Sequence, residues 1–169
     1  MSKKQKLSLI TLITLLGGFG SYYAIKQLHR STAIRVVHFQ GCDTSLWQHI
    51  YHSQRLRVIE SCTQVSGVLE TVLKEKDGDY HLRLKLDNQY LNLLNEKNIS
   101  DQHGDLVLEP VCENQITQAD AVSACKNFHG TIVIPPINTH ISVLGSYVLD
   151  TEHGWMEIHP VTSLNVIKQ

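Results

Sequence analysis

Residues 57–87 read RVIESCTQVSGVLETVLKEKDGDYHLRLKLD, and this stretch predicts a long strand, a tight turn and a second strand. The first part, residues 57–74, is rich in Val and Leu and carries Gly67 in its interior, where barrel strands often bend or bulge. The turn falls at residues 76–79, because the Asp-Gly pair there accepts the positive φ angles of two-residue hairpin turns. A long bent first strand that enters a hairpin suits an OB-type barrel.

The second strand, residues 80–87, alternates between apolar and polar side chains. Leucine occupies every second position, and the positions between carry His81, Arg83, Lys85 and Asp87. Successive side chains of a strand point to opposite faces. One face of this strand is therefore expected in the core and the other in water.

Three more strands are predicted downstream, at residues 106–111, 139–150 and 154–161. The intervening residues 88–104 are polar, so we expect a helical turn followed by an exposed loop. This loop contains Asn98-Ile99-Ser100, which is a formal glycosylation sequon.

Two short helices are expected between the strands. One begins at Asp43 or Thr44, either of which can cap it, and its apolar residues recur at helical spacing. The other runs from Thr117 to about Lys126, because Thr117 and Asp120 match a capping box. The predicted fold class is all-β with minor helices: a five-stranded OB-like barrel preceded by an N-terminal hydrophobic helix.

The first thirty residues have the pattern of an export signal. Three lysines precede an uncharged stretch at residues 7–25, and no acidic side chain occurs in residues 1–30. About 20 apolar residues can span a bilayer as a helix, and the preceding positive charge favours a cytoplasmic N-terminus. Small residues near the end of the stretch would also permit cleavage.

The domain organisation follows from this pattern. We expect a signal anchor or signal peptide at residues 1–30, a linker with a short helix that packs on the barrel at 31–55, and an OB-like domain at 56–169. The domain would be attached to the membrane through residues 7–25 and face the extracytoplasmic side, or be secreted or periplasmic after cleavage.

The exported part is acidic. Residues 31–169 contain ten basic and sixteen acidic residues, which gives a net charge of −6. Nucleic-acid affinity depends largely on Lys and Arg side chains that neutralise phosphates. The composition therefore disfavours nucleic acid as a partner.

The chain has four cysteines, at positions 42, 62, 112 and 125. An even number in an exported chain favours disulfides over metal binding, and no CxxC pair is present to suggest zinc. Among the three pairings that four cysteines allow, we prefer Cys42–Cys62 and Cys112–Cys125. Each of these joins sequence neighbours and encloses one predicted helix.

Four strings of residues resemble a group of small exported OB-fold-like proteins of unknown function. They are CTQVSG at 62–67, DGDYH at 77–81, YVLD at 147–150 and the closing HGWMEIHP at 153–160. The resemblance covers about residues 56–166. It implies a fold and a location outside the cytoplasm, and it implies no activity.

The chain is less similar to staphylococcal-type nucleases, which also use an OB barrel and often carry Asp-Gly-Asp before a strand. Here Asp77-Gly78-Asp79 is followed by Tyr80-His81 and not by Thr. Convincing counterparts of the catalytic arginines of that family are absent. This departure argues against nuclease activity.

The closing string holds the strongest candidate site. In a strand, His153, Trp155, Glu157 and His159 would project from one face. Three interpretations are open: a ligand site, a metal site, or a structural network in which Trp155 is buried and Glu157 and His159 lock the last strand by hydrogen bonds.

The ligand-site interpretation adds Tyr147 to these four residues, because Trp155 and Tyr147 could stack on a sugar, a base or a peptide ring. The metal interpretation takes Glu157 and His159 with Asp79 and His81 from another strand, since carboxylates and imidazoles bind Zn²⁺ or another divalent ion. No cofactor is expected otherwise.

Catalytic signatures are missing from the sequence. It has no Gly-x-Ser-x-Gly elbow, no phosphate-binding glycine loop and no matched nucleophile and base. We therefore expect a non-enzymatic binding or assembly module for a protein, peptide or glycan. The alternatives are a metal-dependent, nuclease-like hydrolase and, less favoured, a single-stranded nucleic-acid binder.

Overall fold

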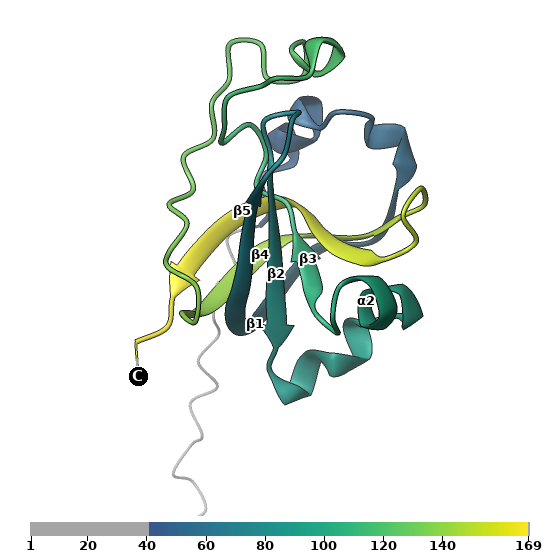
Figure 1. Cartoon of the computed structure of the whole chain (residues 1–169), viewed down its shortest axis with the longest axis vertical. Helices are drawn as coiled ribbons and strands as arrows, with labels where there is room; N and C mark the ends of the chain where they lie inside the picture. Colours follow the sequence, from purple (N-terminus) through teal and green to yellow (C-terminus); the bar gives the residue numbers. More distant parts are fainter. Residues whose placement is uncertain (1–40, 169) are drawn as a thin grey trace, which may run out of the picture. The chain divides into compact units, whose positions relative to one another are not determined.

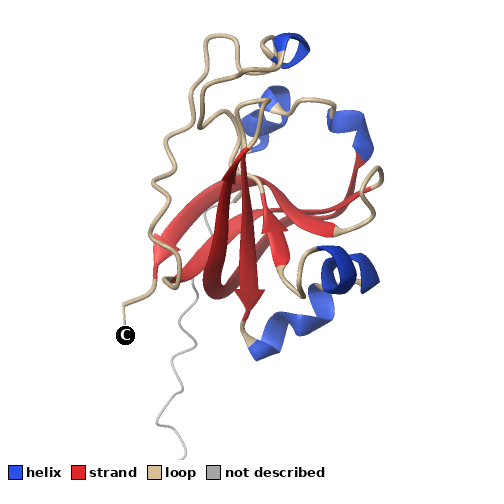
Figure 2. Ribbon diagram, in the orientation of Figure 1, coloured by secondary structure: helices blue, strands red, loops and turns tan. Residues whose placement is uncertain are grey.

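The computed structural model describes residues 41–168, which form a mostly β structure with a few short helices (Figure 2). Five strands hydrogen-bond in the order β1-β2-β3-β5-β4, and β4 pairs with β1, so the sheet closes in a ring (Figure 1). Strand β3 is parallel to β5, and the other neighbours are antiparallel. The strands are β1 (Leu56–Lys74), β2 (Tyr80–Leu86), β3 (Leu106–Leu108), β4 (His140–Asp150) and β5 (Met156–Val166).

Strand β1 holds the ring together because it pairs with two neighbours in succession. Its first two thirds pair with β4, and the part from Gly67 onward pairs with β2. Gly67 lies at the overlap, opposite Leu86 of β2 and Ile141 of β4. A Cβ atom there would collide with the carbonyl oxygen of Lys85, so the close approach of the two strands requires glycine.

The core fills the inside of the ring with Leu, Val and Ile side chains. The predicted alternation in β2 is confirmed for its leucines, of which Leu82 and Leu84 are fully buried. On the other face Lys85 is exposed, but His81 is only 9% exposed, so that face is not uniformly wet. The buried core residues are Val65, Leu69, Leu82, Leu84, Leu86, Leu106, Leu108, Ile141, Val143, Tyr147, Met156, Ile158 and Val161.

The first expected short helix is present as the 3₁₀ helix η1 (Thr44–His49), where Asp43 caps by accepting a hydrogen bond from the Ser45 amide at 2.9 Å. A second 3₁₀ turn, η2 (Ser53–Arg55), leads into β1. The side chains of η1 cover a second, smaller cluster of apolar residues. Its members are Ile50, Val111 and Cys112, packed against Leu46, Trp47, Leu56, Cys125 and Phe128.

The helix expected from Thr117 to Lys126 was wrong. This segment contains only the 3₁₀ turn η4 (Ala119–Ala121), without a capping hydrogen bond from a side chain. The amide of Thr117 donates to the carbonyl of Lys76 in the β1–β2 turn, and Asp120 accepts a hydrogen bond from Tyr51. Both residues of the supposed capping box are therefore engaged in tertiary contacts.

The helical turn expected after β2 is confirmed, but the exposed loop expected before β3 is wrong. After the 3₁₀ helix η3 (Asn88–Leu93), the chain forms α2 (Glu96–Asp101), which Asn95 and Asn98 close with a reciprocal capping box. Asn98 is fully buried, and its amide nitrogen donates to the carbonyls of Asp105 and Met156 at 3.0 and 2.9 Å. Asn98, the asparagine of the sequon, therefore links α2 to β5 by a buried hydrogen bond.

Two strand boundaries differ from the prediction. Strand β3 ends at Leu108, although Glu109 still bonds to β5 through its amide, which donates to the carbonyl of Ile158, and through its carbonyl, which accepts from the amide of Val161. Pro110, which has no amide hydrogen, follows. Strand β5 begins at Met156 and continues to Val166, because its second half pairs with the long β4. Gly154 and Trp155 precede the strand, and Gly154 takes a positive φ of 87° in the turn.

Both preferred disulfides, Cys42–Cys62 and Cys112–Cys125, are present. The first ties the segment before η1 to β1, and the second closes the loop that follows β3. The expected hydrophobic helix at residues 7–25 lies outside the described residues. Within residues 41–168, no helix is long and apolar enough to cross a membrane.

Replacing Gly67 with Ala should destabilise the barrel, because the added methyl group would overlap the Lys85 carbonyl in a backbone contact that cannot rotate away. We expect the free energy of unfolding to fall by about 1–3 kcal/mol, as for other overpacked sites. Urea denaturation measures this change. Gly41→Ala is the control, since nothing lies within 4 Å of its Cβ position, and equal stability of the two variants would contradict the assignment.

Candidate functional site

The closing string forms a chain of hydrogen bonds on the face opposite the core residues Met156 and Ile158. The indole nitrogen of Trp155 donates to Glu157 Oε1 at 2.6 Å, and His159 Nδ1 lies 3.2 Å from Glu157 Oε2. These three side chains occupy alternate positions and share one face, as predicted. His153 belongs to the preceding turn, yet its ring stacks on Trp155 with centroids 4.4 Å apart.

Glu109, the residue that follows β3, lies at the centre of this arrangement. Its Oε2 is 2.9 Å from His159 Nδ1 and 3.5 Å from Arg55 Nη2, and its Oε1 is 3.4 Å from His81 Nδ1. Glu109 is 6% exposed, and His159 is fully buried. One carboxylate therefore contacts a guanidinium and two imidazoles from three different parts of the chain.

Arg55 extends the cluster toward the β4–β5 turn. Its Nε donates to Asp150 Oδ2 at 2.8 Å. Asp150 is fully buried and organises that turn, because it accepts hydrogen bonds from the backbone amides of Glu152 and His153 and pairs with the His153 ring at 2.8 Å. The orientation of the His153–Trp155 ring pair thus depends on Asp150.

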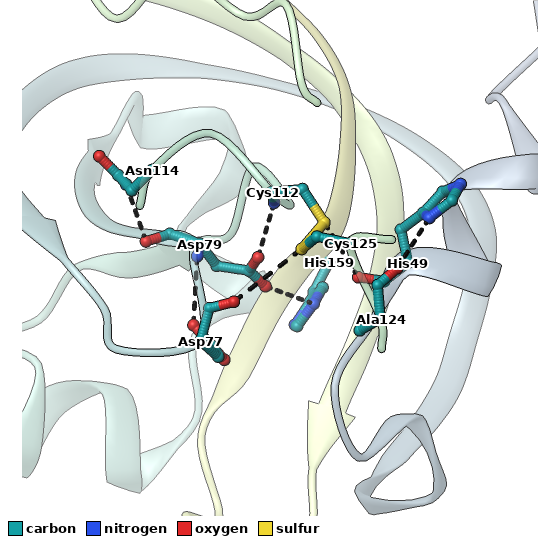
Figure 3. Close-up of a disulfide and its surroundings, with 8 residues drawn as sticks. All are labelled: His49, Asp77, Asp79, Cys112, Asn114, Ala124, Cys125 and His159. Carbon is teal, nitrogen blue, oxygen red and sulfur yellow. Dashed lines mark hydrogen bonds and ion pairs between the residues drawn. A yellow bond between two sulfur atoms is a disulfide. The ribbon is translucent and has the colours of Figure 1, made fainter. Parts of the chain in front are cut away.

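Asp79, at the end of the β1–β2 turn, closes the cluster from the opposite side. Its Oδ1 accepts a hydrogen bond of 2.7 Å from the amide of Cys112, and its Oδ2 lies 3.9 Å from His159 Nε2 (Figure 3). Cys112 has a positive φ of 58° and is bonded to Cys125. The second disulfide therefore fixes the amide that orients Asp79.

The charged side chains of the cluster shift the pKa values of His159 and Glu109. Burial alone lowers the pKa of His159, but the charges of Glu109 and Glu157 and their hydrogen bonds outweigh burial and raise this pKa to about 10. Burial acts to raise the pKa of Glu109, but the charge of His159, hydrogen bonds from His159 and His81, and the charge of Arg55 bring it well below its usual range. The Glu109–His159 contact is thus an ion pair at neutral pH.

Asp79 and Glu157 have raised pKa values, in contrast to Glu109. Burial, reinforced by the charge of Asp77, raises the pKa of Asp79 to about 7, although His159 acts in the opposite direction. Burial and the neighbouring Glu109 also raise the pKa of Glu157. Asp79 and Glu157 therefore bind a proton more readily than exposed carboxyl groups do.

A pocket of about 570 Å³ opens above this cluster. Its walls are the end of β1, the start of β2, the loop after α2 and the β4–β5 turn. It carries both signs of charge together with the Trp155 ring. The lining residues are Arg55, Thr71, Leu73, Glu75, Asp77, His81, Arg83, Asp101, Gln102, His103, Glu109, His153 and Trp155.

No protein-family model, curated protein or solved structure matches this chain. The chemistry of the site therefore has to be inferred from its own geometry.

The predicted ligand-binding residues occupy three levels. His153 and Trp155 line the pocket, and Glu157 and His159 are fully buried beneath it. Tyr147 does not join them: it is 8% exposed, packs in the core and donates a hydrogen bond from its hydroxyl to the Leu93 carbonyl at 2.6 Å.

The structure brings together only two of the four predicted metal ligands, Asp79 and His159, as donors around one point. Asp79 and His159 come together with Glu109, and one donor atom from each lies within 4.8 Å of the other two. Glu157 and His81 are the outer neighbours of this group, in contact with His159 and Glu109. A second grouping of Asp79 with Cys112 and Cys125 offers no thiolates, since these cysteines form a disulfide.

Sequence reasoning missed Glu109, Arg55 and Asp150. A signal existed for Glu109, because a charged residue followed by proline directly ends the apolar run at residues 106–108. Arg55 and Asp150 gave no such signal. Their pairing joins residues 95 positions apart, and only the closure of the barrel brings them together.

Glu109→Gln should destabilise the fold by about 3–5 kcal/mol, because it removes the negative charge that compensates buried His159 and Arg55. Chemical denaturation measures the loss. Glu70→Gln is the matched control, since Glu70 forms an exposed ion pair with Lys85 at 3.7 Å that should contribute less than about 1 kcal/mol. A loss at Glu109 no larger than at Glu70 would contradict the central role of Glu109.

Asp150 should make the free energy of unfolding decrease as the pH falls. Burial acts to raise its pKa, but hydrogen bonds from His153 and the charge of Arg55 prevail, so its pKa is lowered in the folded state. A lowered folded pKa gives stability that is present above the unfolded value of 3.8 and is lost as the pH falls through the folded value. Asp150→Asn should therefore be less stable at pH 6, with a flatter decline in stability between about pH 5 and pH 2. Parallel declines of variant and wild type would contradict this.

Proposed function

We propose that this protein is an extracytoplasmic binding module with an OB-like barrel, and that its ligand is a charged peptide segment held in the pocket above the buried cluster. The observation that carries the proposal is the pocket itself. It combines a flat aromatic pair with side chains of both charges, and a rigid buried network supports it from below.

The strand arrangement supports the OB-like assignment. The order β1-β2-β3-β5-β4 with a parallel β3–β5 contact matches a five-stranded Greek-key barrel of this kind. The position of the helix differs from the prediction. The sequence predicted a helix between the third and fourth strands, whereas the α-helix α2 lies between β2 and β3. OB barrels bind ligands on the face of strands 2 and 3 and in the loops β1–β2 and β4–β5. The pocket lies beside β2 and these same two turns.

The charges of the pocket favour a peptide over other ligands. The guanidinium groups of Arg55 and Arg83 and three histidines face four carboxylates across the same space. A peptide carries its own charges of both signs and can pair with both sets, whereas a polyanion would meet the carboxylates. The net charge of −6 for residues 31–169 disfavours nucleic acid for the same reason.

The location rests on two further observations. Disulfides persist in oxidising compartments outside the cytoplasm, and two are present here. The lysine-flanked apolar stretch at residues 7–25 has the pattern of an export signal or anchor. Together they support a barrel that meets its partner outside the cytoplasm.

A selection from a random peptide library tests the proposal. The full chain, purified in mild detergent, should enrich charged peptides that compete for one site. Arg83→Glu should weaken the enriched peptides at least tenfold, because Arg83 lines the pocket. Lys85→Glu is the matched control, since it makes the same charge change on the same face of β2 one step beyond the pocket.

Two results would overturn the proposal. One is a selection that enriches no peptide. The other is binding that Arg83→Glu and Lys85→Glu weaken equally, which would indicate attraction to overall charge and not to the pocket.

A further inference from the structure

We infer that Asp79, Glu109 and His159 form a binding site for a divalent transition-metal ion of the Zn²⁺ class. These three residues come from the β1–β2 turn, the end of β3 and the middle of β5. The inference does not depend on which ligand occupies the pocket above.

The unpartnered nitrogen of His159 is the first observation. Its Nε2 is one of three buried side-chain polar atoms without a hydrogen-bond partner in residues 41–168. A buried polar atom without a partner is costly and requires an explanation. Its closest carboxylate, Oδ2 of Asp79, is 3.9 Å away, which is beyond hydrogen-bonding distance.

This distance fits two ligands on either side of a metal ion. Zn²⁺ binds imidazole nitrogen and carboxylate oxygen at about 2.0–2.2 Å, so two tetrahedral ligands are about 3.3–3.6 Å apart. A closure of a few tenths of an ångström would bring Nε2 and Oδ2 to that separation. Glu109 supplies the third donor, and one donor atom from each of the three residues lies within 4.8 Å of the other two. Binding of the ion to Nε2 would displace the proton that His159 carries in the metal-free protein.

The surroundings of His159 are those of a metal-binding histidine. Its other nitrogen, Nδ1, lies 3.2 Å from Glu157 Oε2 and 2.9 Å from Glu109 Oε2. Metal-bound histidines usually donate this second N–H to a carboxylate, which fixes the ring and its tautomer. Glu157 is in turn fixed by Trp155, so the ring has little freedom to rotate.

The charge balance also favours a cation at this place. Four carboxyl groups, those of Asp79, Glu109, Asp150 and Glu157, are at most 6% exposed, and the groups that pair with them include the Arg55 guanidinium and the imidazoles of His81 and His159. Once His159 binds the ion as a neutral ligand, its positive charge no longer compensates these carboxylates. A divalent ion would compensate the excess negative charge where burial makes it most unfavourable. Glu109 lines the pocket, which gives the ion a route to the site and leaves a coordination position for water.

Metal binding to the full chain tests the inference. Protein stripped with chelator and dialysed against micromolar Zn²⁺ should retain one ion per chain, counted by mass spectrometry. Asp79→Asn should weaken this binding at least tenfold, and its remaining side-chain oxygen can still accept the hydrogen bond from Cys112. Asp87→Asn, which removes the carboxylate of a more exposed Asp–His pair with His140 at 3.0 Å, should bind like the wild type.

Crystals of the wild-type chain soaked in Zn²⁺ give a second measurement that needs no variant. An anomalous peak within about 2.2 Å of His159 Nε2 and Asp79 Oδ2 would support the site. Peaks at exposed histidines alone, no stoichiometric ion, or equal binding by Asp79→Asn and Asp87→Asn would overturn it. If Asp79→Asn fails to fold, the crystal measurement decides.

Discussion

The ion pair between His159 and Glu109 is the contact on which the rest of the site depends. Burying one charge alone would be prohibitive, so each of these residues makes the position of the other tolerable. The pair also joins β5 to the end of β3, the two parallel neighbours in the ring. The same contact therefore links these two strands beneath the pocket, which Glu109 lines.

The arrangement around this pair is layered. Asp79 and Glu157 flank the imidazole, Arg55 and His81 meet the Glu109 carboxylate, and the aromatic rings of the β4–β5 turn lie at the pocket. Each layer fixes the orientation of the next, because the side chains are buried and hydrogen-bonded. A ligand in the pocket would thus meet groups that are already ordered, which lowers the entropic cost of binding.

The sequence predicted those parts of the structure that local patterns control. The leucine alternation of β2, the position of the β1–β2 turn, the long first strand and both disulfide pairs are confirmed, because periodicity, turn chemistry and cysteine spacing are local signals. The turn is not the expected two-residue type, since Gly78 has a positive φ and Asp77 does not, and residues 75–79 separate the strands. The expected helix at Thr117 was wrong because its capping residues bind distant partners instead. The sequence also indicated Glu157 and His159 through their shared strand face, but not Glu109 or Arg55, whose roles arise from barrel closure.

Asn98 has a practical consequence for anyone who produces this protein. The enzyme that attaches glycans in the eukaryotic secretory pathway acts on nascent chains, before the asparagine of Asn-Ile-Ser has reached its buried position between α2 and β5. A sugar added there would occupy the space of the buried amide, and Asn98 could not keep its hydrogen bonds to the carbonyls of Asp105 and Met156. A bacterial host, or a variant that changes Ser100 and leaves Asn98 in place, avoids this obstacle.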